Sequence, residues 1–347
     1  MIAAQTKKDA SSTATSQSSF STTLPARVLA SSSLVTSQSS SSSKAKTTSP
    51  STERVEVRSG QEEIVGHLAD YATAMAHSTA RTHSFMVCFF GGSARFIRWD
   101  HSATIVSEPI DLVKQAILFP SLLHAFTSAS DSNKGRDSTV QLVPPDDAAS
   151  ICRAARDALR KLGPRVQEVL KLAFANPSEL RQFKVKLEGA DKSVDMFGNA
   201  QPTNISPTLH GRFTRGWPLF YPASKRFYWY KWVWRVQGTD PEGQIYLRLH
   251  EAKVRNIPTM AGFGDLSDNS SERWQRSITS HLLLLGPSLL WLDMDTLARL
   301  QALRQSWILL EEVGVPLTSV VSTKELITAA RDATEVMTST WTHKTVS

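Results

Sequence analysis

The segment from Gly211 to Glu251 restricts the fold more than any other part of the sequence. Two apolar and aromatic runs, Arg212–Phe220 and Phe227–Val236, flank the turn Tyr221-Pro222-Ala223-Ser224. Runs of this kind around a turn predict an antiparallel β-hairpin. The second run contains Lys231, and burial of an ammonium group costs several kcal/mol unless an anion or a carboxylate meets it. The fold must therefore supply a negative group beside this strand.

A helix directly after the hairpin is the expected source of that negative group. Pro241 predicts its first turn, where the missing N–H of proline costs no hydrogen bond. We expect Asp240 or Thr239 to be the N-cap and the helix to end near Val254.

Glu242, in the first turn of that helix, is the predicted partner of Lys231, and Glu251 is the alternative partner. A second interpretation stays open, in which Lys231 lies on the surface and Glu242 only complements the helix dipole. Side chains alternate along a strand, so Lys231 is expected to share its face with three residues: Trp229, Val233 and Arg235.

Composition indicates two compact units and a tail in an intracellular protein, either cytoplasmic or nuclear. The 347 residues are 41% hydrophobic, and the net charge of +7 owes much to five basic residues against one acidic residue in the first fifty. The rest is mildly basic, so we expect no nucleic acid partner. Cys88 and Cys152 form no disulfide framework, and neither cysteines nor histidines show metal-ligand spacing. The longest apolar run, Leu282–Leu292, is broken by Gly286-Pro287 and too short to span a bilayer, so no membrane contact is expected.

Three regions follow one another along the sequence. Residues 1–55 are rich in Ser and Thr, with few large apolar side chains, so we predict a disordered tail. A mitochondrial transit peptide is the alternative interpretation, because the segment is also poor in acidic residues. Residues 56–200 predict an α/β region, and residues 201–347 contain the hairpin.

Hydrophobic periodicity and turn residues predict the individual elements. The helices expected in residues 56–200 are Glu62–Ala80, Glu108–Ser128 with a break or new start at Pro120, and Asp146–Leu162 capped by Asp146 or Asp147. The strands expected there are Ser84–Phe90 and Ala94–Trp99 around Gly91-Gly92-Ser93, then Ala103–Ser107, and Phe183–Leu187 in the ambiguous stretch 168–208, with a loop at Gly198–Pro207. After the hairpin we expect a turn at Gly262-Phe263-Gly264-Asp265, helices at Ser271–Leu285, Asp295–Arg304 and Ser322–Thr340, and a strand at Trp307–Val313.

Seven blocks between about Glu62 and Ala333 resemble those of one known family. They are Arg81–Phe85, Ala94–Asp100, Ile105–Glu108, Gly135–Val140, Gly211–Gly216, Lys231–Arg235 and Val313–Leu317. On these blocks the chain resembles the fungal-type protein kinases, a divergent branch of the protein-kinase-like fold. The resemblance implies an α+β fold. Its kinase-like small lobe, a twisted antiparallel sheet with one packed helix in residues 201–347, follows a family-specific α/β extension in residues 56–200.

The resemblance also implies roles for individual residues. Lys231 is expected to bind ATP phosphates while Glu242 holds the lysine. Gly211, Thr214 and Gly216 are expected to replace the glycine loop of kinases and to cradle phosphates through backbone N–H groups.

Two aromatic residues weaken this expectation of a nucleotide site. The segment Gly211–Gly216 is equally well explained as a bend before the strand, and Phe213 favours this alternative. Trp229 is expected near the position of the adenine, where its ring would narrow the pocket for the base. We therefore expect the affinity for ATP to be weak or absent.

Some positions depart from the family pattern. The family usually has arginine at the position of His101 and more glycine where this chain has Phe213. Residues Glu325–Ala333 resemble the helix before the catalytic loop, but neither His-Arg-Asp with a downstream Asn nor Asp-Phe-Gly follows. Phosphoryl transfer needs a carboxylate that orients the acceptor and groups that hold the metal. We therefore expect a kinase-like chain truncated before its catalytic loop. It should be inactive in the family's phosphorylation of protein Ser or Thr, and Mg binding is not expected without the large lobe.

A non-catalytic protein-interaction module is the alternative function. Without a large lobe, an apolar seam near Trp307–Leu310 is expected to be uncovered and to favour a protein partner or self-association. The aromatics between Trp217 and Trp234 also suggest a stacking platform for single-stranded nucleic acid, but such runs more often form core. A group of Arg and Asp residues is expected to lock a hairpin by ion pairs rather than to act in catalysis; its members are Arg95, Arg98, Asp100 and Asp137.

Overall fold

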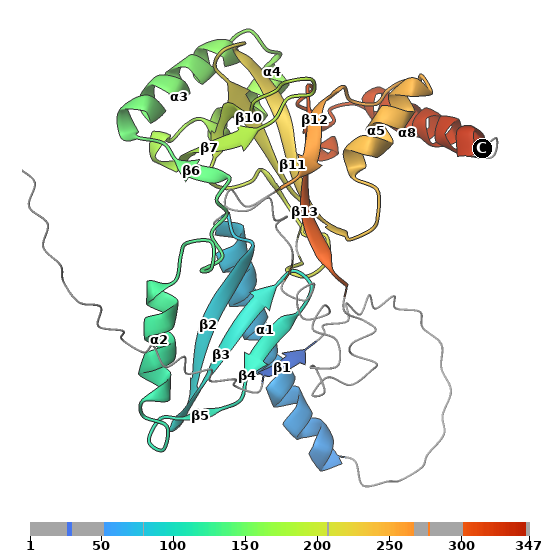
Figure 1. Cartoon of the computed structure of the whole chain (residues 1–347). Coiled ribbons are helices and arrows are strands. Elements are labelled where there is room, and N and C mark those ends of the chain that lie inside the picture. Colours follow the sequence, from blue (N-terminus) through green and yellow to red (C-terminus); the bar gives the residue numbers. More distant parts are fainter. Residues whose placement is uncertain are drawn as a thin grey trace, which may run out of the picture.

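Two antiparallel sheets with helices beside them make up the described part of the chain (Figure 1). The computed structural model describes residues 26–29, 52–78, 80–206, 208–266, 277 and 301–344. Within these residues no helix is both long and apolar enough to cross a bilayer. The mixture of helices and antiparallel sheet confirms the predicted α+β class.

The first sheet has a helix on each face. Its strand order is β1-β4-β3-β2, with β5 paired to β3. The elements are β1 Ala26–Leu29, α1 Thr52–Ser78, β2 His83–Phe90, β3 Ser93–Asp100, β4 Thr104–Ser107, β5 Ile110–Asp111 and α2 Leu118–Ser128. Ala72 and Ala76 of α1 pack with Ile97 on one face. On the other face, the ring of Phe126 of α2 lies 5.3 Å from that of Phe85.

The predicted elements of this first sheet are largely confirmed, with one correction. The expected helix Glu108–Ser128 is wrong in its first half, where β5 and a turn precede α2. Pro120 lies in the first turn of α2, which agrees with the new helix start expected there. Two described segments, residues 26–29 and 52–55, fall within the stretch 1–55 that the sequence predicts to be a tail. Ala26–Leu29 form β1, which pairs with β4, and α1 already begins at Thr52.

The second sheet is eight-stranded and contains the predicted hairpin. Its order is β12-β13-β11-β10-β8-β7-β6, with β9 paired to β10. The strands are β6 Val140–Leu142, β7 Leu180–Val185, β8 Val194–Asn199, β9 Asn204–Ile205, β10 Arg215–Tyr221, β11 Arg226–Val236, β12 Met260–Asp265 and β13 Leu303–Leu310. Strands from before and after residue 200 share this sheet, so the predicted domain boundary there falls inside one sheet.

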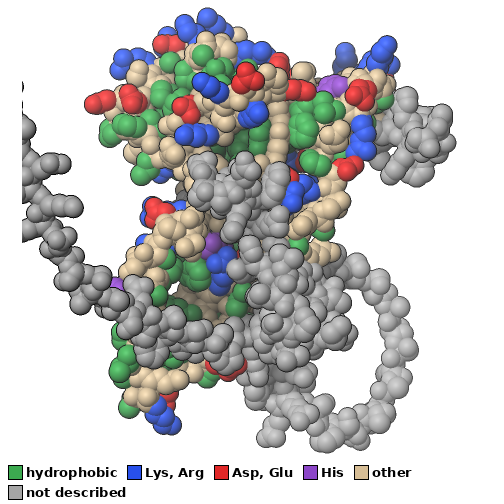
Figure 2. All heavy atoms as spheres, in the orientation of Figure 1, with side chains coloured by type: hydrophobic (Ala, Val, Ile, Leu, Met, Phe, Trp, Pro, Cys, Tyr) green, Lys and Arg blue, Asp and Glu red, His purple; other side chains and the backbone are tan. Residues whose placement is uncertain are grey.

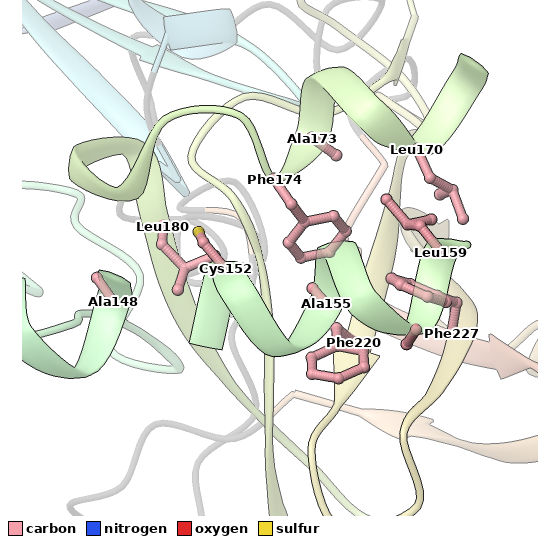
Figure 3. Packing of buried hydrophobic residues seen from close by; sticks show 11 residues of the cluster. Ala148, Cys152, Ala155, Leu159, Leu170, Ala173, Phe174, Leu180, Phe220 and Phe227 are labelled. Atoms are coloured by element: carbon pink, nitrogen blue, oxygen red, sulfur yellow. The ribbon is translucent and has the colours of Figure 1, made fainter. Parts of the chain in front are cut away.

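Helices surround this sheet. They are α3 Pro145–Leu159, α4 Pro164–Ala173, α5 Glu242–Glu251 and α8 Thr323–Lys344. Figure 3 shows how α3 and α4 pack against the end of the hairpin. There Phe174 makes edge contacts with Phe220 and Phe227, at 6.3 and 5.5 Å between ring centres.

The aromatic run of the hairpin is core, as predicted. Tyr230, Trp232 and Trp234 of β11 are at most 2% exposed. Trp217 of β10 packs on Trp232 with their ring centres 4.8 Å apart. The sheet curls so that the face carrying these aromatic rings lies inside. The two ends of the curl meet where the N–H of Glu188, just after β7, donates to the carbonyl of Ala261 in β12. Buried rings cannot stack on nucleic acid, and basic and acidic side chains are interspersed over this part of the visible surface (Figure 2).

Several predictions around this sheet need correction. Gly262-Phe263-Gly264-Asp265 is not a turn but most of β12. Pro241 is itself the N-cap of α5, and neither Asp240 nor Thr239 caps it by a side-chain hydrogen bond. Likewise Pro144 is the N-cap of α3, and neither Asp146 nor Asp147 holds that position. The ambiguous stretch 168–208 contains the end of α4 and strands β7, β8 and β9, so the expected loop at Gly198–Pro207 is interrupted by β9.

The expected apolar seam at Trp307–Leu310 is also wrong. These residues belong to β13, which lies between β12 and β11, and each is at most 8% exposed. The predicted helix Ser271–Leu285 lies outside the described residues apart from Ser277. Only residues 301–304 of the predicted helix Asp295–Arg304 are described, and the last two of them belong to β13 instead. The predicted last helix is confirmed as α8.

The two sheets meet at a buried aromatic and charged junction. The ring of Phe213 stacks on that of His101 at 4.3 Å and lies 5.7 Å from that of His77 on α1. The guanidinium of Arg215 lies over Phe213 and donates to the carbonyl of Ala76. Burial lowers the pKa of Arg215 to about 9, and the nearby charge of Asp137 offsets part of that effect.

His101 makes this junction sensitive to acid. Burial, aided by the positive charge of Arg215, lowers the pKa of His101 to about 3, although a hydrogen bond with the Leu209 carbonyl opposes the shift. The unfolded chain therefore binds more protons between pH 6.5 and 3. The stability that neutral His101 confers is complete above pH 6.5 and is lost as the pH falls toward 3.

We predict that His101→Gln reduces the pH dependence of unfolding. In the unaltered chain, His101 lowers the free energy of unfolding by up to about 1.4 kcal/mol for each pH unit below 6.5. Glutamine does not titrate, so this loss disappears in the variant. Urea unfolding midpoints between pH 7 and 4 measure the effect. His124→Gln, on the exposed side of α2, is the control. Equal pH slopes for His101→Gln and the unaltered chain would contradict the prediction.

Candidate phosphate-binding site

Lys231 and Glu242 form a close ion pair between β11 and α5. The Lys231 Nζ atom lies 2.7 Å from Oε1 and 2.8 Å from Oε2 of Glu242. The two side chains are 25% and 24% exposed, so solvent still reaches the pair and it stabilises the fold by only about 1 kcal/mol. The lysine meets the predicted carboxylate. The alternative partner, Glu251, is at the exposed far end of α5.

Gly243 sets how closely α5 approaches the sheet. A Cβ atom on Gly243 would lie 1.9 Å from Cγ of Phe263 on β12. Tyr246 and Leu247 of α5 pack with Phe263 around the buried Ile308. This contact brings the first turn of α5, and with it Glu242, to the lysine.

A second cation lies beside the same carboxylate. The Arg212 Nη2 atom is 3.8 Å from Oε2 of Glu242, and the Arg212 side chain is 69% exposed. Two cations therefore share one anion. Two of the three N–H groups of the ammonium face Glu242, so Lys231 keeps donor capacity toward solvent.

The indole of Trp229 fills the space over Gly216, directly across the hairpin from Lys231. Gly216 pairs with Lys231 in the β10–β11 register. A Cβ atom on Gly216 would lie 2.3 Å from Cζ2 of Trp229. Trp229 also packs with Met260, Ile308 and Leu310. The glycine therefore makes room for an aromatic ring of the protein itself.

The segment Gly211–Gly216 is tied into the fold on both sides. The N–H of Gly211 donates to the carbonyl of His101, and the carbonyl of Arg212 accepts from Trp234. Gly211 and Phe213 have positive φ angles of 90° and 37°, and Phe213 is 2% exposed. The carbonyl of Thr214 accepts from Ser206. Of the three predicted residues, Gly216 thus lies directly across from Lys231, whereas the Gly211 N–H is bonded to His101 and the Thr214 carbonyl to Ser206.

Sequence reasoning missed a second charged cluster on the Lys231 side of the sheet. Arg235 contacts Asp265 through Nε at 3.1 Å and Nη2 at 2.6 Å, and Arg304 and Ser306 also donate to this carboxylate. Burial alone raises the pKa of Asp265, but these donors together hold it below its ordinary value. The residues 262–265 were expected to be a turn, which hid this strand contact.

The four Arg and Asp residues expected to lock a hairpin have different partners. Arg98 pairs with Asp100 at 3.6 Å, while Arg95 donates to the carbonyl of Ser107. Asp137 accepts a hydrogen bond from Gln305 of β13. This bond ties the segment between the two sheets to β13 and does not lock the β2–β3 hairpin.

The profile of the family described as fungal protein kinase matches residues 31–346 of the sequence. The chain belongs to the fungal protein kinase family. Comparison with curated proteins and with solved structures gives no match. In this fungal kinase family member, Lys231 and Glu242 both lie within the matched residues, on β11 and α5.

Other possible ligand sites in this family member lie away from Lys231. Surface hollows of about 400 and 710 Å³ are lined by residues 322–332 of α8 and its approach, and by residues 113–121. Among the described residues no group of three or more His, Cys, Asp or Glu is placed to hold a metal ion.

We predict that Gly243→Ala destabilises the protein. In an exposed helix this change would stabilise by up to about 1 kcal/mol, but here the new methyl group collides with Phe263, and overpacking costs about 1–3 kcal/mol. Urea unfolding measures the net loss. Gln244→Ala, exposed on the same helix, is the matched control, and a higher stability of Gly243→Ala would refute the close contact.

Proposed function

We propose that this chain is a kinase-like module that binds the phosphates of ATP weakly through Lys231. The single observation that supports this is the contact of the Lys231 ammonium with both Glu242 oxygens at 2.7 and 2.8 Å. In kinases a lysine held in this way pairs with nucleotide phosphates. The pair is partly exposed, so a phosphate can reach the ammonium without unfolding the sheet.

Three features support a low affinity. The Gly211 N–H is engaged with His101, so it adds no donor to a phosphate cradle. Phe213 is buried, which prevents its segment from folding down over a ligand. The Trp229 ring narrows the adenine side of the site.

A bound Mg²⁺ ion would bridge phosphate oxygens and neutralise their charge. Among the described residues no group of three or more His, Cys, Asp or Glu is placed to hold one, and we assign no metal ligand. The chain's own part in the proposal is to attract and orient phosphate oxygens at Lys231.

The proposal includes no phosphoryl transfer by these 347 residues alone. The sequence contains neither His-Arg-Asp nor Asp-Phe-Gly, and transfer needs a group that orients the acceptor hydroxyl. Without it, a bound nucleotide lacks a positioned acceptor.

A non-catalytic interaction module is the second candidate function. Exposed apolar side chains favour it, since Leu317, Val321 and Ile327 before and on α8 are 61%, 79% and 62% exposed. Exposed apolar side chains that form a contiguous patch mark a protein contact surface more often than single exposed apolar residues do. The partner of this surface would be a protein.

We predict a dissociation constant for ATP in the micromolar range or weaker, measured by calorimetry. Lys231→Ala should weaken binding by about tenfold or more, equal to ~1.4 kcal/mol. Lys225→Ala, in the exposed turn of the same hairpin, should bind as the unaltered chain does. Submicromolar ATP binding would contradict the proposed low affinity, and equal binding by Lys231→Ala would remove Lys231 from the site.

We also predict that the purified 347-residue chain transfers no labelled phosphate from ATP to a protein Ser or Thr substrate. The reason is the absent acceptor-orienting group. An active protein kinase on the same substrate serves as the positive control. Transfer that Lys231→Ala abolishes would overturn the inactive interpretation.

A further inference from the structure

We propose that the Lys231 site recognises a polyphosphate chain rather than a nucleoside, with Arg212 as its second phosphate-binding side chain. This inference rests on the proposed function and names the ligand class more narrowly. ATP, GTP and inorganic tripolyphosphate would bind alike, because none of the recognition falls on the base.

The charges around Glu242 support the role of Arg212. Its guanidinium lies 3.8 Å from the carboxylate that also holds Lys231, so the cluster of two cations and one anion has an excess positive charge. Arg212 is 69% exposed, and a guanidinium binds phosphate through paired N–H donors. Since the Gly211 N–H is occupied by the His101 carbonyl, side chains take over the role that backbone groups have in a glycine loop.

Among the residues that the structure describes, those around Lys231 leave no apolar slot for a base on its face of the sheet. Toward β10, the Trp229 indole already covers Gly216. Toward β13, Ile308 is fully buried in the cluster that includes Phe263 and Tyr246. Farther along β11, Arg235 is committed to Asp265.

Calorimetric titration with ATP, GTP, tripolyphosphate and adenosine tests the inference on the full chain. The first three should bind with dissociation constants within about threefold of one another, and adenosine should give no heat of binding. Arg212→Gln should weaken all three phosphorylated ligands by about tenfold. Arg248→Gln is the matched control, because Arg248 is exposed on α5 and pairs with Asp240 at 2.5 Å.

The possible failures point to different conclusions. Loss of ATP binding in Lys231→Ala but not in Arg212→Gln would overturn the role of Arg212 and leave the proposed function intact. Absence of binding by ATP and tripolyphosphate alike would overturn the proposed function itself. A chain that binds ATP at least tenfold more tightly than tripolyphosphate recognises the base, which would overturn the assigned ligand class.

Trp229→Ala separates a filled base position from a stacking platform. If the indole blocks the base, its removal should strengthen ATP binding relative to tripolyphosphate. If the exposed part of the indole stacks on adenine instead, its removal should weaken ATP binding and leave tripolyphosphate unchanged, which would contradict the inference. Circular dichroism of the variant, compared with that of the unaltered chain, establishes that the sheet remains folded.

Discussion

The burial of one aromatic face of the β10–β11 hairpin is the constraint on which the rest of the larger sheet depends. Trp217, Tyr230 and Trp232 turn toward the inside of the sheet and are at most 2% exposed. Covering them requires β6 to β8 on one side and β12 and β13 on the other, curled until Glu188 reaches a carbonyl of β12. The opposite face of β11 is then left for α5. Lys231 lies on that face, where Glu242 meets it.

The same aromatic packing explains how much of the site the sequence could predict. The hairpin and the partner of Lys231 depend on residues at most thirty positions apart, and local patterns identified both. Strand β12 was missed because Gly262 and Gly264 look like turn residues. Glycine is needed at these two positions because of tertiary contacts. A Cβ atom on Gly262 would lie 2.5 Å from the Lys186 carbonyl, and Gly264 faces Trp307. The partners of these glycines are distant in sequence, so no local pattern could reveal them, and the Asp265 cluster stayed hidden with them.

The junction between the two sheets follows from positions that looked unrelated in the sequence. His101 and Phe213 are the two departures from the family pattern named from the sequence, and in the structure their rings stack at 4.3 Å. An arginine at 101 could not occupy this apolar stack without a partner for its charge, whereas a neutral histidine can. One contact therefore accounts for both departures, and it fixes the segment before β10 to the first sheet.

This fixed segment changes which atoms can hold a phosphate. A glycine loop binds by folding flexible backbone N–H groups around the anion, whereas here Phe213 is buried and the Gly211 N–H is bonded to His101. In the proposed site, recognition comes instead from charged side chains: the partly exposed Lys231 and the exposed Arg212, which both lie beside Glu242. Charged side chains attract an anion without reading a base. The proposed weak affinity and the proposed indifference to the nucleoside would thus both follow from the contacts that hold this segment.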